Sequence, residues 1–359
     1  MTRVLHLAPA LFDDAGRPAG GGERYAFELA RHMADRCPTR LVAFGPEDRR
    51  DRVGAMALRV YGGEWRNGRR QHDPLDLRAI AREVRAASIV HCHQRNYRMS
   101  KFAALVAQSL GRRAFVTDHG GGVWGPGVWV PDRGLFDGHL FVSEFSRRSN
   151  GAPRGARTTV VYGGVDHHRF SPGEGGRGDS ALFVGRLMPH KGVDVLIEAL
   201  PDGMGLDVVG AVVDERYYGE LRALAAGRPV RFHHDWDDSR LVEGYRTARC
   251  AVLPSLYVDR YGRRTPVPEL LGQTLLESMA CGTPVVCSDA GGMPEVVQDG
   301  VSGFVVPAND RARLRERLSQ LRADELAERM GAAARAHVER HFTWSATAQR
   351  CLLAYGARG

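Results

Sequence analysis

The sequence predicts an α/β protein made of two doubly wound domains, each with a largely parallel sheet. Short apolar runs of strand length alternate with amphipathic runs of helix length through both halves of the chain. A polar, glycine-rich stretch at 171–180, SPGEGGRGDS, separates the two series and is the expected linker. With 359 residues, the chain is long enough for two domains. We expect a first domain over 1–172 and a second over 173–341, with ligands at the carboxyl ends of the strands.

The first half opens with a buried-strand pattern at 3–10, followed by three glycines, Glu23 and an amphipathic helix over 24–34. This is a strand–loop–helix unit with glycines just before the helix. The other strands expected here are 39–44, 58–61, 88–93, 114–118, 138–143 and 158–162, with helices at 75–87, 100–110 and near Ser146.

The second half repeats the alternation. Strands are expected at 181–185, 206–210, 230–233 and 250–253, and helices at 193–200, 215–226, 238–248, 310–320 and 324–340, with a terminal helix after Trp344.

The stretch 267–306 reads as loop, helix, strand, glycine-rich turn, helix and short strand. Glu269 and Glu277 lie eight residues apart, a little over two helical turns. Either one helix covers both carboxylates, which then share a face, or the helix begins near Gly272 and Glu269 lies at its mouth.

Composition indicates a globular protein, with 43% hydrophobic and 26% charged residues and no apolar run long enough to span a membrane. The N-terminus reads as a first strand and not as a signal peptide. Six cysteines form no CxxC pair, so we expect reduced core residues in a cytoplasmic protein. The charge of +8 comes mostly from arginines scattered among acids, which is weak evidence for nucleic acid, and we expect no such partner.

Several kinds of site find no support. The glycines at 20–22 lack the G-x-G-x-x-G spacing of a dinucleotide fold, and no G-x-S-x-G nucleophile motif occurs. His91 and His93 alternate along one strand, and with no further ligand nearby we expect local hydrogen bonds there, not a metal. His119, in TDHGGG at another strand end, is the better site candidate.

Two groups of residues could bind an anion. Gly21 and Gly22 lie where a strand meets a helix and backbone N–H groups can approach a phosphate, although a plain helix start fits them equally well. Arg186 and Lys191 follow the first strand of the second half across a turn that contains proline. One guanidinium fork and one ammonium there can neutralise a diphosphate.

Together these motifs resemble retaining GT-B glycosyltransferases of family 4. The motifs are the Arg186…Lys191 pair, GVDHHRFSP, LPS at 253–255, Glu269-x7-Glu277 and GGMPEVVQDGVSGFVVP. The resemblance covers most of the chain. It implies two Rossmann-like domains facing across a cleft, a nucleotide sugar held mainly by the second, an acceptor held mainly by the first, and residues 342–359 crossing back to the first domain as a helix.

The same resemblance implies roles for individual residues. Arg186 and Lys191 would bind the donor diphosphate and stabilise its departure. Glu269 would contact hydroxyls of the donor sugar, Glu277 the ribose hydroxyls, and His119 the donor sugar near the reacting carbon. The expected catalytic residues are therefore His119, Arg186, Lys191 and Glu269.

Further binding residues follow from the resemblance. Sugar and phosphate would be held at the helix mouth by backbone groups of Leu271, Gly272, Gln273 and Thr274, with Gly21 and Gly22 against the diphosphate or the acceptor. The expected acceptor-side residues are Glu23, His93, Tyr97 and Trp124.

The chemistry expected at such a site needs no metal. Breaking the anomeric bond leaves an oxocarbenium-like centre and a departing diphosphate, and two cations with helix amides can stabilise the negative charge. We expect no metal site and no cofactor, with the nucleotide sugar as co-substrate. Retention would proceed on the front face, and Glu269 as a covalent nucleophile is the alternative.

The sequence departs from the family pattern at two places. The aromatic-glycine pair that usually follows the first glutamate is replaced by Leu270-Leu271-Gly272, and the preceding loop, 256–268, is longer than usual. The form PELLGQTLLE looks like glycosyltransferases of actinobacterial secondary metabolism, including aminoglycoside-type pathways. The loop would either line the donor or acceptor mouth through Tyr257, Tyr261, Arg263 and Arg264, or form a surface excursion.

The expected activity is metal-independent transfer of a hexose-type sugar, from UDP in the first instance, to a hydroxyl of a small natural-product or sugar/cyclitol acceptor. One alternative is synthesis of a cell-envelope polysaccharide or glycolipid, and another is a non-catalytic module that binds nucleotide sugars. We do not expect membrane association, but basic residues on helix 24–34 keep a membrane-surface acceptor as an alternative.

Overall fold

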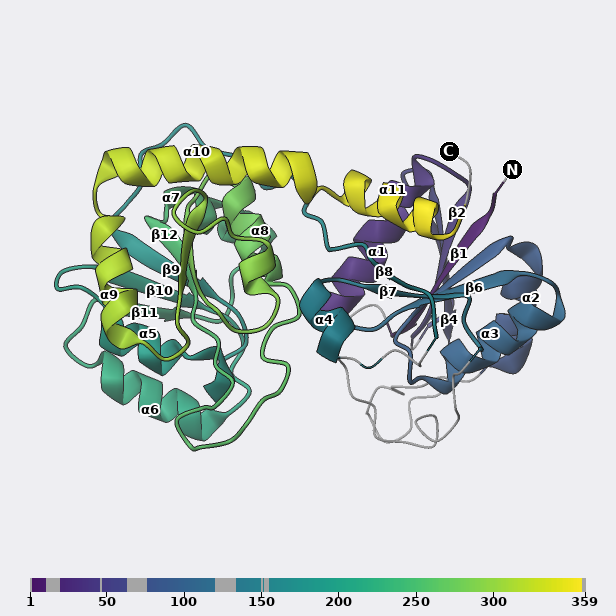
Figure 1. Cartoon of the computed structure of the whole chain (residues 1–359), viewed down its shortest axis with the longest axis horizontal. Helices are drawn as coiled ribbons and strands as arrows, with labels where there is room; N and C mark the ends of the chain where they lie inside the picture. The colour runs from purple at the N-terminus through teal and green to yellow at the C-terminus, as the bar shows by residue number, and fades with distance from the viewer. Residues whose placement is uncertain are drawn as a thin grey trace. The chain divides into compact units, whose positions relative to one another are not determined.

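The computed structural model describes residues 2–10, 20–45, 47–62, 76–119, 134–149, 151 and 155–356. The chain forms two compact units (Figure 1). The first consists of Met1–Gly164 with Trp344–Gly359, and the second of Val165–Thr343. Each contains one sheet, and the two are described separately below.

The first unit holds an eight-stranded sheet in the order β3-β4-β2-β1-β5-β6-β7-β8. Every neighbouring pair is parallel except β3 and β4. Its strands are β1 (Val4–Ala10), β2 (Thr39–Gly45), β3 (Arg49–Val53), β4 (Met56–Gly62), β5 (Ile89–His93), β6 (Arg113–Thr117), β7 (Gly138–Phe141) and β8 (Thr158–Val160).

Helices cover both faces of this sheet, because successive strand residues point to opposite sides. Leu7 and Val42 pack in one buried cluster with α2 and α3, whereas Ala8 and Leu41 pack in a second cluster with α1. The terminal helix α11 also packs on α1. The helices are α1 (Gly21–Ala34), α2 (Leu77–Ala86), α3 (Arg98–Ser109), α4 (Glu144–Ser149) and α11 (Trp344–Ala354).

The second unit holds a six-stranded, fully parallel sheet in the order β11-β10-β9-β12-β13-β14. Its strands are β9 (Ser180–Val184), β10 (Gly205–Val209), β11 (Val230–His233), β12 (Cys250–Leu253), β13 (Val285–Ser288) and β14 (Gly303–Val306). Its helices are α5 (Val193–Ala199), α6 (Glu215–Ala225), α7 (Asp238–Thr247), α8 (Gln273–Ala280), α9 (Arg311–Gln320) and α10 (Asp324–His341), with 3-10 turns η3 (Pro189–Lys191) and η4 (Met293–Glu295).

The strand order of each sheet reverses at one point, and ligands of such sheets bind outside the carboxyl ends of the strands at that point. In the first unit the reversal lies between β1 and β5, and β5 ends at His93. In the second unit it lies between β9 and β12, which are followed by Gly185 and Pro254.

The predicted α/β class with two doubly wound sheets is confirmed, but two elements differ from the prediction. Strand β3 was not expected, because its sequence RRDRV has no apolar alternation and it pairs as an antiparallel edge strand with only β4. The helix expected after Asp289 is only the 3-10 turn η4, since Val296 and Val297 are buried at its end and the chain turns there.

The first unit ends after Gly164, earlier than the expected boundary at 172. The segment that follows belongs to the second unit, because Arg335 Nη1 donates hydrogen bonds to the carbonyl oxygens of His167 and Phe170, both at 2.8 Å. Arg246 Nε similarly donates to the carbonyl oxygen of Ser171 at 2.7 Å. The glycine-rich stretch is therefore anchored to the second unit by arginines that lie far along the chain.

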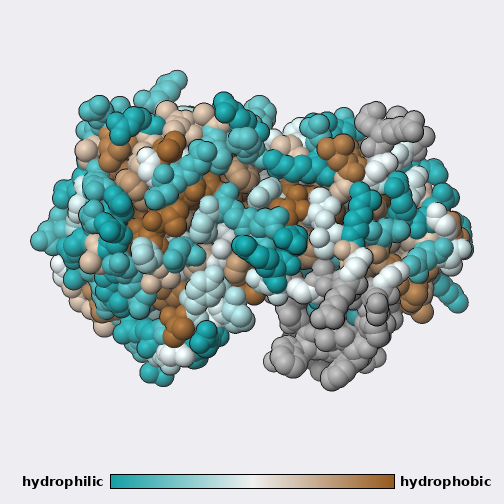
Figure 2. Space-filling model, in the orientation of Figure 1, coloured by the Kyte–Doolittle hydropathy of each residue, from teal (hydrophilic) through white to brown (hydrophobic). Residues whose placement is uncertain are grey.

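None of the described helices is both long and apolar enough to cross a bilayer. Figure 2 shows hydrophilic side chains spread over both units on the face drawn, with hydrophobic ones between them. The six cysteines are unpaired and five are buried, as the sequence predicts for core residues.

Candidate functional site

In the second unit, the chain after β9 packs directly against the chain after β12. Gly192 follows η3 with φ +68°, and a Cβ there would lie 2.2 Å from the carbonyl oxygen of Pro254. Only glycine fits this close approach in a left-handed conformation. The contact places Lys191 beside Ser255, at the carboxyl edge of the sheet where its strand order reverses.

Lys191 and Glu269 form an ion pair at this edge. Lys191 Nζ donates to Glu269 Oε1, and the Oγ of Ser255 donates to the same oxygen at 3.3 Å. The two charged side chains are only 12% and 15% exposed, so each needs the other to offset its desolvation. Lys191 and Glu269, which are both expected to bind the donor, are thus in direct contact although they lie 78 positions apart in the sequence.

Glu269 is held by the glycine pair that follows β13. Gly292 N–H donates to the carbonyl oxygen of Glu269 at 3.1 Å. Gly291 has φ +68°, and a Cβ there would lie 2.1 Å from that same oxygen. Gly291 N–H also donates to the hydroxyl of Tyr257 at 2.9 Å. The backbone of Glu269 therefore lies directly against these two glycines.

Helix α8 begins after Gly272, so the second of the two arrangements proposed for the paired glutamates is confirmed. Gly272 has φ +91° and no side chain caps the helix. Glu269 therefore precedes the helix, and Glu277 lies within it. Leu271 is buried beside this N-terminus, and Gln273 and Thr274 form its first turn, where the helix dipole favours a negative charge.

Glu277 is buried, with 5% of its surface exposed. The hydroxyl of Tyr245, on α7, donates to its Oε2 at 3.0 Å. A buried carboxylate needs such a partner. Nothing in the sequence around Tyr245 marks it as a site residue, because its role arises only when α7 packs against α8.

Arg186 is exposed, and within the described residues no hydrogen bond or ion pair holds it. It lies close enough to His190 to affect its titration. Burial, then the charges of Lys191 and Arg186, lower the pKa of His190 to about 4, against the opposing effect of Glu269. The site therefore gathers two cations, one carboxylate and a neutral imidazole near pH 7.

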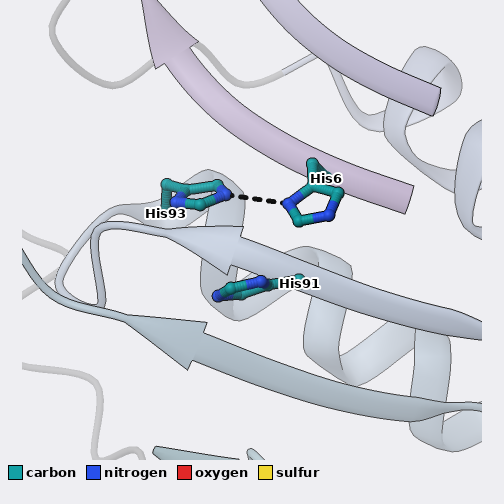
Figure 3. Close-up of side chains that lie close together, drawn as sticks. All are labelled: His6, His91 and His93. Carbon is teal, nitrogen blue, oxygen red and sulfur yellow. Dashed lines mark hydrogen bonds between the residues drawn. The ribbon is translucent and has the colours of Figure 1, made fainter. Parts of the chain in front are cut away.

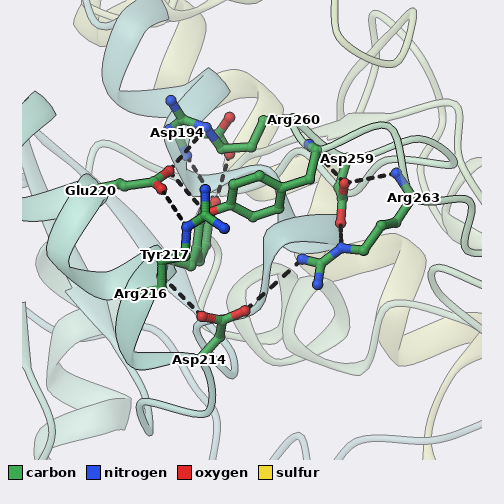
Figure 4. Close-up of polar contacts among 9 residues, drawn as sticks. Asp194, Asp214, Arg216, Tyr217, Glu220, Asp259, Arg260 and Arg263 are labelled. Carbon is green, nitrogen blue, oxygen red and sulfur yellow. Dashed lines mark hydrogen bonds and ion pairs between the residues drawn. The ribbon is translucent and has the colours of Figure 1, made fainter.

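The long loop 256–268 is tied to itself and to α6 (Figure 4). The Asp259 carboxylate accepts from the backbone N–H groups of Tyr261 and Arg263, at 2.9 and 3.0 Å, and from Arg263 Nε at 2.8 Å. The hydroxyl of Tyr261 donates to Glu220 of α6 at 2.8 Å, and Arg260 pairs with the same carboxylate at 3.3 Å.

The loop forms one wall of a cavity of about 640 Å³ in the second unit. His190, next to Lys191, also lines this cavity. Arg263 and Arg264 line this hollow, whereas Tyr257 and Tyr261 are not among its lining residues. The lining residues are Met188, Pro189, His190, Val213, Asp214, Glu215, Asp259, Arg263, Arg264 and Thr265.

In the first unit, His93 and His119 lie together at the carboxyl edge of the sheet. His93 ends β5, and His119 follows the end of β6 by two residues. The Nδ1 of His93 lies 3.2 Å from the Nε2 of His119, and the two rings are stacked. Gly22 contacts this group, since a Cβ there would lie 3.1 Å from the Cβ of His119. The ring of Tyr25 lies 4.6 Å from that of His119.

A third histidine joins the pair on β5, contrary to the expectation that no further ligand-type residue lies nearby. His6 on β1 is the register partner of His91 and hydrogen-bonds to His93 (Figure 3). Side-chain nitrogens of His6, His91 and His93 lie within 4.8 Å of one another. Sequence reasoning missed His6 because strand neighbours in a parallel sheet are far apart along the chain.

His91 has separate partners. Its Nε2 lies 2.8 Å from the hydroxyl of Thr117, and its Nδ1 lies 2.7 Å from the hydroxyl of Tyr355 on the C-terminal segment. Every ring nitrogen of His6, His91 and His93 thus has a hydrogen-bond partner. The expected local hydrogen bonds of His91 and His93 are confirmed.

Burial keeps these imidazoles neutral. It lowers the pKa of His6 to about 3 and that of His119 to about 4. The pKa values of His91 and His93 fall well below the ordinary range, because burial and the neighbouring histidines both oppose protonation.

The remaining predicted acceptor-side residues are placed as follows. The carboxylate of Glu23 lies against Gly20, and Gly21 opens α1 in an exposed position. Tyr97 is buried at the start of α3. Trp124 lies outside the described residues.

Known families match both halves of the chain. The model of "Glycosyl transferases group 1" matches residues 165–337, and that of "Glycosyltransferase Family 4" matches residues 19–169. Together the two matches extend over both units, apart from the terminal segments.

Two curated relatives are similar in sequence. A D-inositol 3-phosphate glycosyltransferase of Streptomyces bingchenggensis is 31% identical, with 53% of this chain and 45% of that protein aligned. A phosphatidyl-myo-inositol mannosyltransferase of Mycobacterium leprae is 32% identical, with 64% and 61% aligned. The chain spans about half the length of the curated relatives it matches.

Among solved structures, Anabaena Alr3699/HepE in complex with UDP and glucose matches with a TM-score of 0.72 and 18% identity, covering 100% of both chains. Similarity at this level of identity establishes the fold, which is that of the GT-B proteins.

Proposed function

We propose that this chain is a retaining hexosyltransferase, because the models of group 1 glycosyl transferases and of family 4 glycosyltransferases match its two halves. It would move a hexose-type sugar from a nucleotide diphosphate, with UDP first among the candidates, to a hydroxyl of a small acceptor. The observation that carries the proposal is the partly buried Lys191–Glu269 ion pair beside the start of α8. It supplies a cation for a phosphate and a carboxylate for sugar hydroxyls within one contact.

The residues of the second unit fit the demands of the donor. Lys191 and the exposed Arg186 would take up the charge that develops on the diphosphate as it leaves. The uncapped N-terminus of α8 would add backbone N–H groups and the positive end of the helix dipole. Glu277, held by Tyr245, would bind the ribose hydroxyls.

The chemical step would need no metal ion or other cofactor. The bond between the anomeric carbon and the diphosphate oxygen breaks, and the acceptor oxygen bonds to that carbon from the same face. The acceptor proton passes to the departing diphosphate, which the two cations stabilise. Glu269, engaged with Lys191 and Ser255, acts in this scheme by orienting the sugar and not as a nucleophile.

A cyclitol or sugar acceptor is favoured over other hydroxyl compounds. Both curated relatives are named for inositol-containing acceptors, D-inositol 3-phosphate in one and phosphatidyl-myo-inositol in the other. A natural-product acceptor of the aminoglycoside type contains a related cyclitol. The second of those names also favours the alternative of glycolipid synthesis.

The test is a matrix of donors and acceptors followed by release of the free nucleotide. UDP-glucose, UDP-N-acetylglucosamine and GDP-mannose would each be offered with inositol 3-phosphate, an aminocyclitol, or vesicles containing phosphatidylinositol. Transfer to a soluble cyclitol supports the proposal, and transfer only to vesicles would replace it with the glycolipid alternative. Nucleotide-sugar binding without any turnover would support a non-catalytic module.

A further inference from the structure

A row of side chains, buried except for the half-buried His119, runs from α1 through β1 and β5 to the residues after β6. It starts at Met33, whose Sδ lies 3.2 Å from the Nε2 of His6. The Nδ1 of His6 lies 3.1 Å from the Nε2 of His93 (Figure 3), and the Nδ1 of His93 lies 3.2 Å from the Nε2 of His119. Met33, His6 and His93 are at most 1% exposed.

The first member of this row decides where the proton of the second must lie. A thioether sulfur has no hydrogen and can only accept a hydrogen bond. The Nε2 of His6 must therefore carry the proton that it donates to Met33. Burial keeps His6 uncharged near neutral pH, so its other nitrogen, Nδ1, carries only a lone pair.

The same reasoning passes along the row. Because Nδ1 of His6 is an acceptor, the Nε2 of His93 must donate to it, and the neutral ring of His93 keeps a lone pair at Nδ1. The Nε2 of His119 must then donate to that lone pair. A neutral His119 has no second proton, so its own Nδ1 is left as an acceptor.

We propose that Met33, His6 and His93 are positioning residues that fix His119 as its Nε2–H tautomer, so that His119 offers a hydrogen-bond acceptor at Nδ1 to a substrate hydroxyl. The use of that acceptor rests on the proposed function and on the role that the family resemblance implies for His119, a hydrogen bond to the donor sugar. A neutral imidazole nitrogen can be either a hydrogen-bond donor or an acceptor, depending on the tautomer. Here the buried thioether of Met33 determines the tautomer. The site would thus select a group that donates a hydrogen bond to Nδ1, such as a free hydroxyl.

His91 provides the matched comparison within the same strand. It is as buried as His93, but its nitrogens face the hydroxyls of Thr117 and Tyr355. Hydroxyls can donate or accept, so its tautomer is not dictated in this way. No hydrogen bond among the described residues links it to the row that ends at His119.

The tautomers can be read directly from the full-length protein with histidine labelled by ¹⁵N in the ring. Two-bond ¹⁵N–¹H correlation spectra near neutral pH distinguish a protonated ring nitrogen from a bare one, with signals assigned from single His→Gln variants. We expect His6, His93 and His119 all to be protonated at Nε2 and bare at Nδ1. A proton at Nδ1 of His119 would overturn the proposal. So would a shift of these signals towards metal-bound positions on adding Zn²⁺ to the protein as purified.

Met33→Leu tests the anchor, because it keeps the approximate volume but removes the acceptor sulfur. The signals of His6, His93 and His119 should then move together towards the average of two tautomers, while that of His91 stays in place. Unchanged signals of His119 in this variant would show that Met33 does not set the tautomer.

The functional consequence is tested by two substitutions of one residue. His93→Gln keeps an oxygen that can accept from His119, and His93→Leu does not. We expect His93→Leu to lower kcat at least tenfold with little change in the KM for the nucleotide sugar, and His93→Gln to recover most of the loss. Equal losses in the two variants would contradict the positioning role. If no transfer occurs at all but the tautomers are as stated, the proposed function fails and the assignment of the protons stands.

Discussion

Lys191 and Glu269 share one partly buried contact, so the effect of changing either residue includes the cost of leaving the other alone. When Lys191 is replaced, Ser255 is the hydrogen-bond partner that remains for the Glu269 carboxylate among the described residues. Comparing the activities of variants changed at Lys191, at Glu269 and at both residues therefore separates the loss of donor binding from the cost of leaving one charge of the pair without its partner.

Lys191→Met should lower kcat by about 10²–10³-fold, because a positive group aimed at the departing diphosphate is lost. Circular dichroism and thermal unfolding should show that the variant remains folded. Lys191→Arg, which keeps the charge in a different shape, should retain more activity. Full activity in Lys191→Met would remove this residue from the mechanism.

Glu277→Gln should act mainly on binding of the nucleotide. The substitution keeps the volume but removes the charge that would accept hydrogen bonds from ribose, so the KM for the nucleotide sugar should rise with a smaller effect on kcat. Tyr245→Phe is the companion variant, since it removes the hydroxyl that holds Glu277. It should weaken nucleotide binding by about 1 kcal/mol, measured by calorimetry. Unchanged affinity in both variants would assign Glu277 to packing alone.

The turn after β13 is the element that positions Glu269, and a pair of glycines tests this. Gly291 and Gly300 both have positive φ, at +68° and +76°. A Cβ at Gly291 would clash with the carbonyl oxygen of Glu269, whereas one at Gly300 would meet open space. Both alanine variants should lose about 1 kcal/mol of stability from backbone strain.

Gly291→Ala should lose more stability than Gly300→Ala in urea unfolding, and it alone should impair transfer by displacing Glu269. Equal losses of stability and activity in the two variants would show that the close approach at Gly291 has no special role.

The loop 256–268 shows how much of an element a sequence can reveal. Its length and its departure from the family pattern marked it for attention. Its shape depends on Asp259. Burial raises the pKa of this carboxyl, but the hydrogen bonds from Arg263 and Tyr261 outweigh that effect, so the pKa lies below its ordinary value. That local pairing of residues four apart is readable in principle. The attachment of Tyr261 to Glu220, 41 positions earlier, is not.

The same distinction between local sequence and packing separates the site residues that were predicted from those that were missed. Strand periodicity and glycines at turns predicted both sheets except for the edge strand β3. The position of two cations after a strand selected Lys191, and the family resemblance selected Glu269 and Glu277. Tyr245, His6 and Met33 were missed, because each acts through a neighbour brought close only by packing. Their own surroundings in the sequence read as ordinary core.

At the scale of the whole molecule, the buried histidines make the first unit sensitive to acid. The pKa of His6 is lowered to about 3 and that of His119 to about 4, and those of His91 and His93 are also lowered. In the unfolded chain each would titrate near 6.5 and bind protons more readily. The stability that depends on these neutral histidines is therefore fully present above that pH. Below it, each such histidine lowers the free energy of unfolding by up to about 1.4 kcal/mol per pH unit.

We expect the first unit to lose more stability than the second as the pH falls from about 6.5 towards 4. The pKa values of His167, His190 and His337 in the second unit are also lowered, but these side chains are less buried than His6, His91 and His93. Urea unfolding at several pH values, followed by proteolysis and mass spectrometry of the surviving fragment, would identify the unit that opens first. His6→Gln should flatten the pH dependence even if it lowers stability at neutral pH. Equal loss of both units, or earlier loss of the second, would contradict this expectation.

The configuration at the anomeric carbon of the product tests the proposed activity most directly. Proton NMR would follow transfer from an α-linked UDP-sugar to a cyclitol acceptor, with and without EDTA. We expect an α-linked product formed at the same rate in both conditions. A β-linked product, or turnover that stops when EDTA is present, would contradict the metal-independent, retaining reaction.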